Sequence, residues 1–290
     1  MTNKYLNYYN QLKKYKLFIS IMKDKYISIP NLETNYIPQG FCFVKDYTLI
    51  TAYDYTKQNN SIIYIMNKNK ELIKTVLLED KYHVGGISYH KKSNSIYITG
   101  KSGVDNGLSS YISKYNFSDL LNKTNIKAAT KFQVDNNNTL KSSITNKSSV
   151  AYLTIYNDCL YLGNFTIKNK GKIKKYKLDT NGDIISDSCI TLSNPYKKTQ
   201  GLCIYKKNNE YYYIFSTSLS RFKDSTIYIS KLNNNKFKLV KKIKLPVMSE
   251  QINITNLNEL SILFESGSKK FKGSKNKIND ICFLDINSII

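Results

Sequence analysis

The chain has 290 residues, a formal net charge of +23, 25 tyrosines and only 4 prolines. This length suits a single all-β domain, and the abundance of tyrosine beside isoleucine favours strands. The lysines are spread along the chain and Arg221 is the only arginine, although arginine is best suited to bidentate contacts with phosphate and guanine. This pattern argues against nucleic acid as the partner.

Cysteine usage and the N-terminal sequence indicate the compartment. The five cysteines include no Cys-x-x-Cys pair and most lie inside apolar runs, which predicts buried free thiols in a reducing compartment. The apolar stretch 17–22 is too short to span a membrane, and no small-residue cleavage site follows it. We therefore expect a cytoplasmic protein without a transmembrane segment, or a secreted one if a signal segment precedes this sequence. Residues 1–22 are expected to form an extension with a short helix over 5–12, and residues 23–290 a single domain.

In chain order, the first β-rich run covers residues 25–29. A pattern of four short runs separated by polar turns follows, and it recurs along the chain. The runs of the first copy are 38–43, 49–53, 61–65 and 72–78. The second copy begins near residue 83 and includes a long polar stretch, 117–147. We interpret this stretch as an outer connection with a helical turn near 119–121 and an ordered part at 131–134.

The later copies keep the same layout. The third begins near residue 149 and has Asn181-Gly182 between two runs, which is a good hairpin signal. The runs of the fourth copy are 199–204, 211–215, 226–229 and 238–245. The fifth copy has only three runs, 251–254, 260–264 and 278–284. Because neighbouring runs are too close for crossover helices, we expect antiparallel meanders.

The starts of the copies align through Gly40, Gly86, Ala151, Gly201 and Gln251. Their spacing is about 50 residues, with one longer step over the polar stretch, and this is the size of a propeller blade. The run missing from the last copy is supplied by residues 25–29, and this pairing removes the loose end of the ring. The sequence therefore predicts an all-β fold, a five-bladed β-propeller of four-stranded antiparallel blades whose last blade is closed by an N-terminal strand.

Several short motifs resemble those of a group of bacterial propeller proteins that are often secreted and mostly uncharacterised. The resemblance covers roughly residues 25–290 and implies the propeller fold but little about activity. The motifs are Pro38-Gln-Gly, His83-Val-Gly-Gly-Ile, Thr199-Gln-Gly-Leu, Met248-Ser-Glu and Phe264-Glu-Ser-Gly-Ser. More distantly, the layout is similar to the five-bladed glutaminyl cyclases and to the gluconolactonase and strictosidine synthase-like propellers. The latter have six blades and hold a divalent cation in the channel, so their ligands are not carried over to this chain.

Polar residues at the starts of the first strands and the ends of the second strands are the candidate site. In an antiparallel meander these positions lie at the same end of the sheet, so they should converge at the mouth of the central channel. Glu265, Glu250 and His83 are the predicted catalytic residues. The predicted substrate-binding residues are Gln39, Asp54, Asn164, Gln200 and Arg221.

Each of these residues also has a structural interpretation. Gln39, Gln200 and Glu250 occupy equivalent positions and would equally well cap loops of neighbouring blades. A lone histidine such as His83 is more often structural than catalytic, and the second histidine, His90, is expected to be solvated. Arg221 either anchors a substrate or forms an ion pair between blades, with Asp54 or Glu265 as its partner.

No metal-binding or phosphate-binding motif is present, and Gly-x-Ser-x-Gly is absent. The predicted cofactor is therefore none, or a divalent cation (Ca²⁺ or Mg²⁺) held by oxygens of Asp54, Asn164, Glu250 and Glu265. The predicted function is a small-molecule enzyme of hydrolase, lyase or cyclase type. The alternative is a non-catalytic propeller that binds a ligand, a glycan or a protein, with Tyr53 and Tyr55 as stacking surfaces. We expect a monomer with a small-molecule or glycan ligand in the channel.

Overall fold

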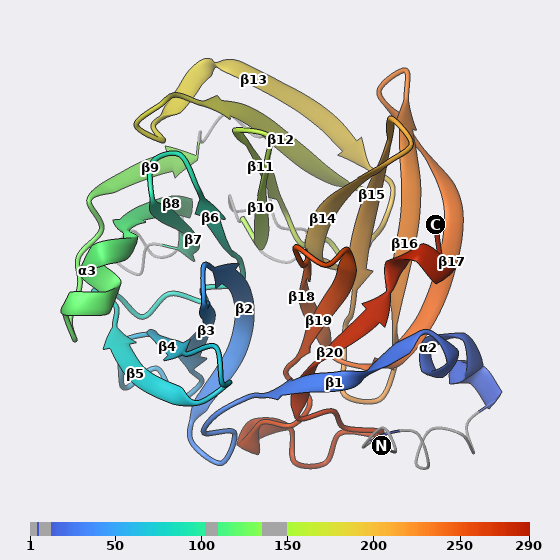
Figure 1. Cartoon of the computed structure of the whole chain (residues 1–290), viewed down its shortest axis with the longest axis horizontal. Helices are drawn as coiled ribbons and strands as arrows, with labels where there is room; N and C mark the ends of the chain where they lie inside the picture. Colours follow the sequence, from blue (N-terminus) through green and yellow to red (C-terminus); the bar gives the residue numbers. More distant parts are fainter. Residues whose placement is uncertain (1–4, 6–12, 102–109, 135–149) are drawn as a thin grey trace.

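The computed structural model describes residue 5 and residues 13–101, 110–134 and 150–290. Its strands form five sheets around a central axis (Figure 1). Each sheet has four strands that pair antiparallel. The predicted five-bladed propeller is confirmed.

Blades 1 to 4 are each built from four consecutive strands, the first innermost and the last outermost. Blade 1 comprises β2 (Tyr36–Val44), β3 (Tyr47–Asp54), β4 (Ile62–Met66) and β5 (Leu72–Leu77). Blade 2 comprises β6 (Ile87–His90), β7 (Ser95–Lys101), β8 (Ser110–Asn116) and β9 (Thr130–Val134). Blade 3 comprises β10 (Tyr152–Tyr156), β11 (Cys159–Gly163), β12 (Gly171–Leu178) and β13 (Ile184–Asn194). Blade 4 comprises β14 (Thr199–Lys207), β15 (Glu210–Thr217), β16 (Asp224–Asn233) and β17 (Lys236–Val247).

Blade 5 joins the two ends of the chain. Its strands are β18 (Ser249–Ile254), β19 (Glu259–Phe264), β20 (Asp280–Asp285) and, outermost, β1 (Met22–Ser28). Ile27 lies opposite Ile281 in the ladder between β1 and β20, and Figure 1 shows the two strands side by side. The hydroxyl groups of Ser28 and Tyr5 both donate to the buried carboxylate of Asp280. The predicted closure by an N-terminal strand is confirmed.

Helices are few in the described residues and lie outside the blades. As expected, α3 (Phe117–Asn122) follows β8, and the ordered part of the polar stretch is β9. At the N-terminal end lie η1 (Lys13–Tyr15) and α2 (Lys16–Ser20), and near the C-terminal end lie η2 (Lys269–Phe271) and η3 (Ile286–Ser288). Of the helix expected over 5–12, residues 6–12 lie outside the described residues. No helix in the described part of the chain is long and apolar enough to cross a membrane.

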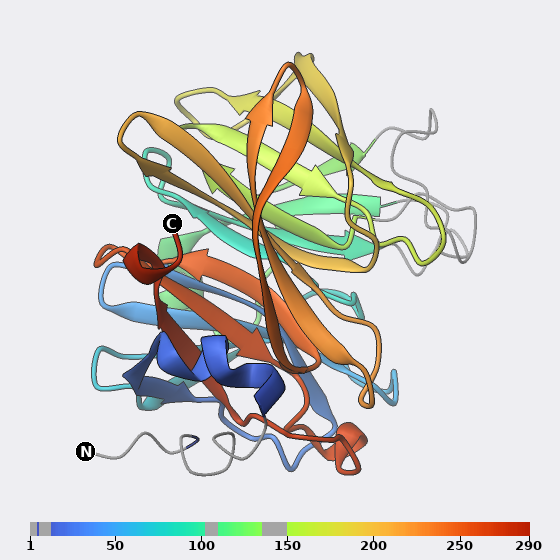
Figure 2. The ribbon, with the colours of Figure 1, turned by 90° about the vertical axis from the view of Figure 1, so that its right-hand side faces the viewer.

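The apolar core is divided among the interfaces between blades. Five clusters of buried side chains each join two neighbouring blades, so every blade is covered on both faces. Inner strands such as β2 are accordingly buried almost throughout, whereas the outermost β17 is largely exposed. The cluster between blades 4 and 5 also includes Tyr15 and Phe18, and Figure 2 shows α2 lying against this part of the ring. The N-terminal segment therefore adds core to the interface beside the closure.

All five cysteines are free thiols, as predicted. Cys42, Cys203 and Cys282 are buried. Burial raises the pKa of the Cys42 and Cys203 thiols well above the ordinary value. Because the thiolate is the reactive form, these two cysteines contribute to packing and not to chemistry.

The aligned residues at the starts of the copies line the channel. Gln251 of blade 5 reaches the backbone of blade 2, where its Oε1 accepts from the N–H of Ile87 at 2.9 Å and its Nε2 donates to the carbonyl of Ile87 at 2.6 Å. It passes in front of Gly40 in blade 1, where a Cβ would lie 2.6 Å from Oε1 of Gln251. Glycine at that position leaves the space that this buried amide occupies. Gln251 thus crosses the channel between non-adjacent blades.

Candidate functional site

The centre of the candidate site is a pair of buried carboxyl groups in blade 5. Glu250 lies at the start of β18 and Glu265 directly after β19, with side chains 2% and 8% exposed. Nε2 of Gln39 donates to Oε2 of Glu265 at 2.7 Å, and Nε2 of Gln200 donates to Oε1 of Glu250 at 3.1 Å. The two carboxyl groups are hydrogen-bonded to each other. Four of the eight predicted site residues therefore form one chain across blades 1, 5 and 4.

The ladder between β18 and β19 explains why the two glutamates meet. Ser249 lies opposite Phe264, and each glutamate directly follows one of these two paired residues. Because successive side chains of a strand point to opposite faces, Glu250 and Glu265 lie on the same face at this end of the sheet. The N–H of Glu265 donates to the carbonyl of Met248 at 3.1 Å, which fixes the last turn of the ladder. Met248 itself has a φ of 63°, in the left-handed region. Below, Glu250 and Glu265 are called the carboxyl pair.

Electrostatics favour a single proton on the carboxyl pair near neutral pH. Burial, then the charge of Glu265, and then the hydrogen bond that Glu250 donates to it raise the pKa of Glu250 well above its ordinary value. Burial raises the pKa of Glu265 to about 7, against hydrogen bonds from Gln39 and Glu250 and the charge of Lys270, which lower it. Two adjacent buried carboxyl groups cannot both ionise at little cost. The proton is thus held by the pair, which titrates as a unit.

An aromatic wall adjoins the carboxyl pair. Tyr53 stacks on His83 with ring centroids 4.4 Å apart, and burial followed by the charges of Glu265 and Glu250 raises the pKa of the Tyr53 hydroxyl. Nζ of Lys270 lies 3.5 Å from the Tyr53 hydroxyl and over the rings of Tyr53, Tyr55 and Phe271. The His83 side chain is exposed, so it forms the rim of the site. Lys270 was not predicted, because it lies in a loop outside the repeat.

The remaining three predicted residues lie apart from the carboxyl pair. Asp54 is buried and accepts hydrogen bonds from the backbone and side chains of Thr56 and Asn59, which outweigh the effect of burial and lower its pKa. Oδ1 of Asn164 accepts from the N–H of Lys172 at 2.7 Å. Arg221 is exposed, with its guanidinium 5.1 Å from the ring centroid of Phe222. Among the described residues, Arg221 forms no ion pair with Asp54 or Glu265.

These positions bear on the predicted cation. Asp54 and Asn164 accept hydrogen bonds within their own blades, whereas Glu250 and Glu265 lie together. The divalent cation stays a prediction. No group of three or more His, Cys, Asp and Glu side chains within the described ranges is arranged to hold a metal ion.

The expectation for His90 was wrong. The ring is 2% exposed, and it contacts Oγ of Ser93 at 2.8 Å through Nδ1 and Oδ1 of Asp158 at 3.2 Å through Nε2. Asp158 belongs to the turn between β10 and β11, so His90 links blade 2 to blade 3. The lysines around it in the sequence concealed this role.

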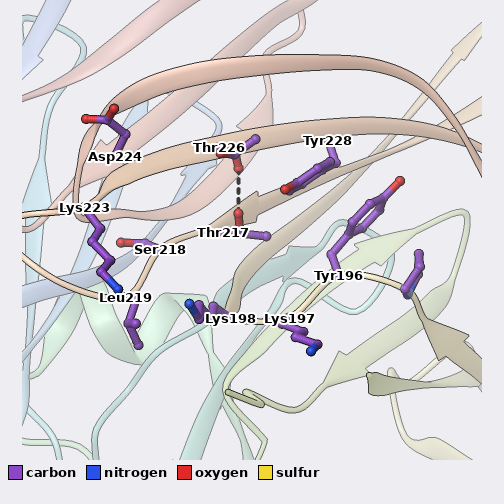
Figure 3. A pocket seen from close by; sticks show the side chains of 11 residues that line it. Tyr196, Lys197, Lys198, Thr217, Ser218, Leu219, Lys223, Asp224, Thr226 and Tyr228 are labelled. Atoms are coloured by element: carbon purple, nitrogen blue, oxygen red, sulfur yellow. Dashed lines mark hydrogen bonds between the residues drawn. The ribbon is translucent and has the colours of Figure 1, made fainter. Parts of the chain in front are cut away.

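Gln251 separates two ends of the channel. The carboxyl pair lies at the end where the inner strands begin. At the other end lie two cavities of about 320 and 530 Å³ that share Ser88, Ile155, Asn253 and Ile254. A third cavity, of about 390 Å³, opens on blade 4 at the same end as the carboxyl pair (Figure 3).

Comparisons with known proteins support the fold. No family model and no curated protein matches the chain, so its resemblance to the bacterial propeller group stays a prediction. A candidate oxidoreductase (glucose dehydrogenase) from Thermus thermophilus has a TM-score of 0.51 at 10% identity, over 90% of this chain and 99% of its own. A GH32 β-fructofuranosidase from Bombyx mori, in complex with sucrose, has a TM-score of 0.50 at 14% identity, over 90% of this chain and 61% of its own. Both are propeller-type folds, and at such low identity the likeness concerns the fold alone.

Proposed function

We propose that the protein is an enzyme for a small-molecule substrate, of hydrolase, lyase or cyclase type, in which the carboxyl pair performs general acid–base catalysis. The observation that carries the proposal is the buried, hydrogen-bonded arrangement of Glu250 and Glu265. A protonated and an ionised carboxyl side by side supply both a proton donor and a proton acceptor at neutral pH. Burying such a pair costs free energy, and the propeller fold does not require a buried carboxyl pair.

The catalytic role of each glutamate follows from the single proton that the carboxyl pair holds. We assign Glu265 as the acceptor, which takes a proton from the attacking nucleophile or from the carbon beside the leaving group. Glu250 is the donor, which delivers a proton to the leaving group. Gln39 and Gln200 hold the two carboxyl groups in place. His83 and Tyr53 would border the substrate at the rim.

The spacing of the carboxyl groups favours some reactions over others. Glycosidases keep their two carboxyl groups about 5–5.5 Å or about 6.5–9.5 Å apart, to leave room for the sugar or for water. The carboxyl groups of Glu250 and Glu265 are directly hydrogen-bonded. This closer arrangement favours proton transfer at one reacting centre over displacement at a glycosidic carbon.

A binding module without turnover remains the second candidate. Gln39 and Gln200 already satisfy the carboxyl pair, and this chain of hydrogen bonds would also serve to tie three blades together. The aromatic rings around Lys270 would then provide the ligand surface.

Replacing one carboxyl decides between the two candidates. Wild-type protein is assayed against a panel of chromogenic esters, lactones, amides and glycosides, and Glu265→Gln is then tested on the substrate that turns over. We expect kcat to fall by about 10²–10⁴-fold, the usual contribution of a general acid or base, while the circular dichroism spectrum of the folded protein is preserved. The exposed Glu71→Gln in the β4–β5 turn is the matched control and should keep full activity. Undiminished turnover in Glu265→Gln, or ligand binding without turnover in the wild type, would refute the enzyme.

A further inference from the structure

The cavity on blade 4 is lined by three lysines and two tyrosines among other residues, and is called the blade-4 pocket. Its residues come from the segment before β14, the end of β15 and the start of β16. They are Pro195, Tyr196, Lys197, Lys198, Thr217, Ser218, Leu219, Lys223, Asp224, Thr226 and Tyr228. Figure 3 shows Lys198, Ser218 and Lys223 on one side and the two tyrosines on the other.

The positive charge of the blade-4 pocket is not compensated. Within the described part of the chain, the ammonium groups of Lys197, Lys198 and Lys223 have no hydrogen-bond or ion-pair partner. The one carboxylate in the lining, Asp224, accepts from Nζ of Lys14 at 2.7 Å and from the Tyr15 hydroxyl at 2.6 Å. Asp224 is therefore neutralised from outside the pocket, and the three lysines remain available to an anion.

Other groups in the pocket suit an oxyanion on a small molecule. The nearly buried Ser218 hydroxyl has no hydrogen-bond partner among the described residues and can donate to an oxygen. Tyr196 and Tyr228 stack at 4.1 Å and form a flat wall, with the Tyr196 hydroxyl bound to Ser230. Lys198 is held with a φ of 62° by hydrogen bonds of its N–H to Thr166 and its carbonyl to Ser218. Residues fixed in this sparsely populated region are often found at functional sites.

The segments that form the pocket continue into strands that reach the carboxyl pair. Gln200, which donates to Glu250, follows Lys198 by two residues. The Ser216 hydroxyl at the end of β15 contacts the Ser249 hydroxyl beside Glu250 at 2.8 Å. The predicted anchor Arg221 lies in the same loop as Lys223. These contacts connect the segments that form the pocket to the strand that carries Glu250.

We propose that the blade-4 pocket binds an anionic group, a carboxylate or a phosphate, of the substrate on which the carboxyl pair acts. Lys198 and Lys223 supply charge-assisted hydrogen bonds, and Ser218 adds a neutral donor. This inference rests on the proposed function for its substrate, while the anion site itself stands independently of it.

Calorimetric titration with two probes, inorganic phosphate and acetate, tests the site at constant ionic strength. We expect the wild type to bind at least one probe saturably at one site, and the tighter probe identifies the anionic class. The double variant Lys198→Gln/Lys223→Gln should bind it about tenfold more weakly. The control Lys236→Gln/Lys238→Gln removes the same charge from exposed positions on β17, at the other end of the blade, and should bind like the wild type.

Two results would overturn the anion site. Equal weakening in both double variants would mean that the probes respond only to the overall charge of +23. Absence of saturable binding of either probe would also refute it. Glu265→Gln separates this inference from the proposed function, because it should lower kcat by about 10²–10⁴-fold while leaving probe binding within about twofold of the wild type. Turnover without probe binding would refute the pocket alone.

Discussion

At the scale of single residues, the carboxyl pair joins two buried ionisable groups at the channel. Burial removes the hydration that normally stabilises two carboxylates, and Gln39 and Gln200 each donate only one hydrogen bond to the pair. A shared proton is the least costly state of such a pair. The same burial that makes the pair chemically useful therefore makes the stability of the fold depend on pH.

The sign of this pH dependence follows from the raised pKa values. Because both carboxyl groups bind protons more tightly in the folded chain, their contribution to stability is fully present below the ordinary value of 4.5 and is lost as pH rises through about 7 for Glu265. Over this window we expect the ionisation of Glu265 alone to lower the free energy of unfolding by up to about 3 kcal/mol. Urea unfolding between these pH values should show a steeper decline for the wild type than for Glu265→Gln, while Glu71→Gln follows the wild type. Parallel curves for all three proteins would contradict raised pKa values.

At the scale of elements, Gln251 connects the inner strands of blades 5 and 2 and packs against that of blade 1. Its amide satisfies both backbone groups of Ile87 across the channel, and Gly40 makes room for it. The repeat therefore has a small residue in the other four copies and one long amide in the fifth. Packing at the channel is a property of the set of strands and not of any single blade.

This matching predicts a specific non-additivity. Gln251→Ala leaves the buried N–H and carbonyl of Ile87 without partners and should lower the free energy of unfolding by about 2 kcal/mol. Gly40→Ala should also destabilise, because its Cβ would lie 2.6 Å from Oε1 of Gln251 and 2.9 Å from Oγ1 of Thr51. In the Gln251→Ala background the first clash is absent, so Gly40→Ala should cost less there. Urea unfolding of the double-mutant cycle measures the coupling, and strictly additive effects would show that the two residues do not interact.

At the scale of the whole molecule, the repeat and the incomplete last copy were sufficient to predict the ring and its closure. Antiparallel geometry then brought Gln39, Gln200, Glu250 and Glu265 together, because each lies at a strand end that the alignment identifies. The loops that follow the second strands do not repeat. Local hydrogen bonds hold Asp54 and Asn164 within their own blades, and Arg221 lies exposed beside Phe222. For the same reason, the alignment contains no signal for Lys270 or for the blade-4 pocket.

The central claim is that the carboxyl pair holds one proton near neutral pH, and carboxyl-carbon NMR of protein labelled with ¹³C-glutamate tests it most directly. The chain has only seven glutamates, so each resonance can be assigned by single Glu→Gln substitutions. Two coupled resonances, from Glu250 and Glu265, should titrate well above the ordinary range, one with a midpoint of about 7. Glu265→Gln should remove one of them and shift the other. If all seven carboxyl groups titrated near the usual glutamate value of about 4.3, the shared proton, and with it the proposed acid–base role, would be contradicted.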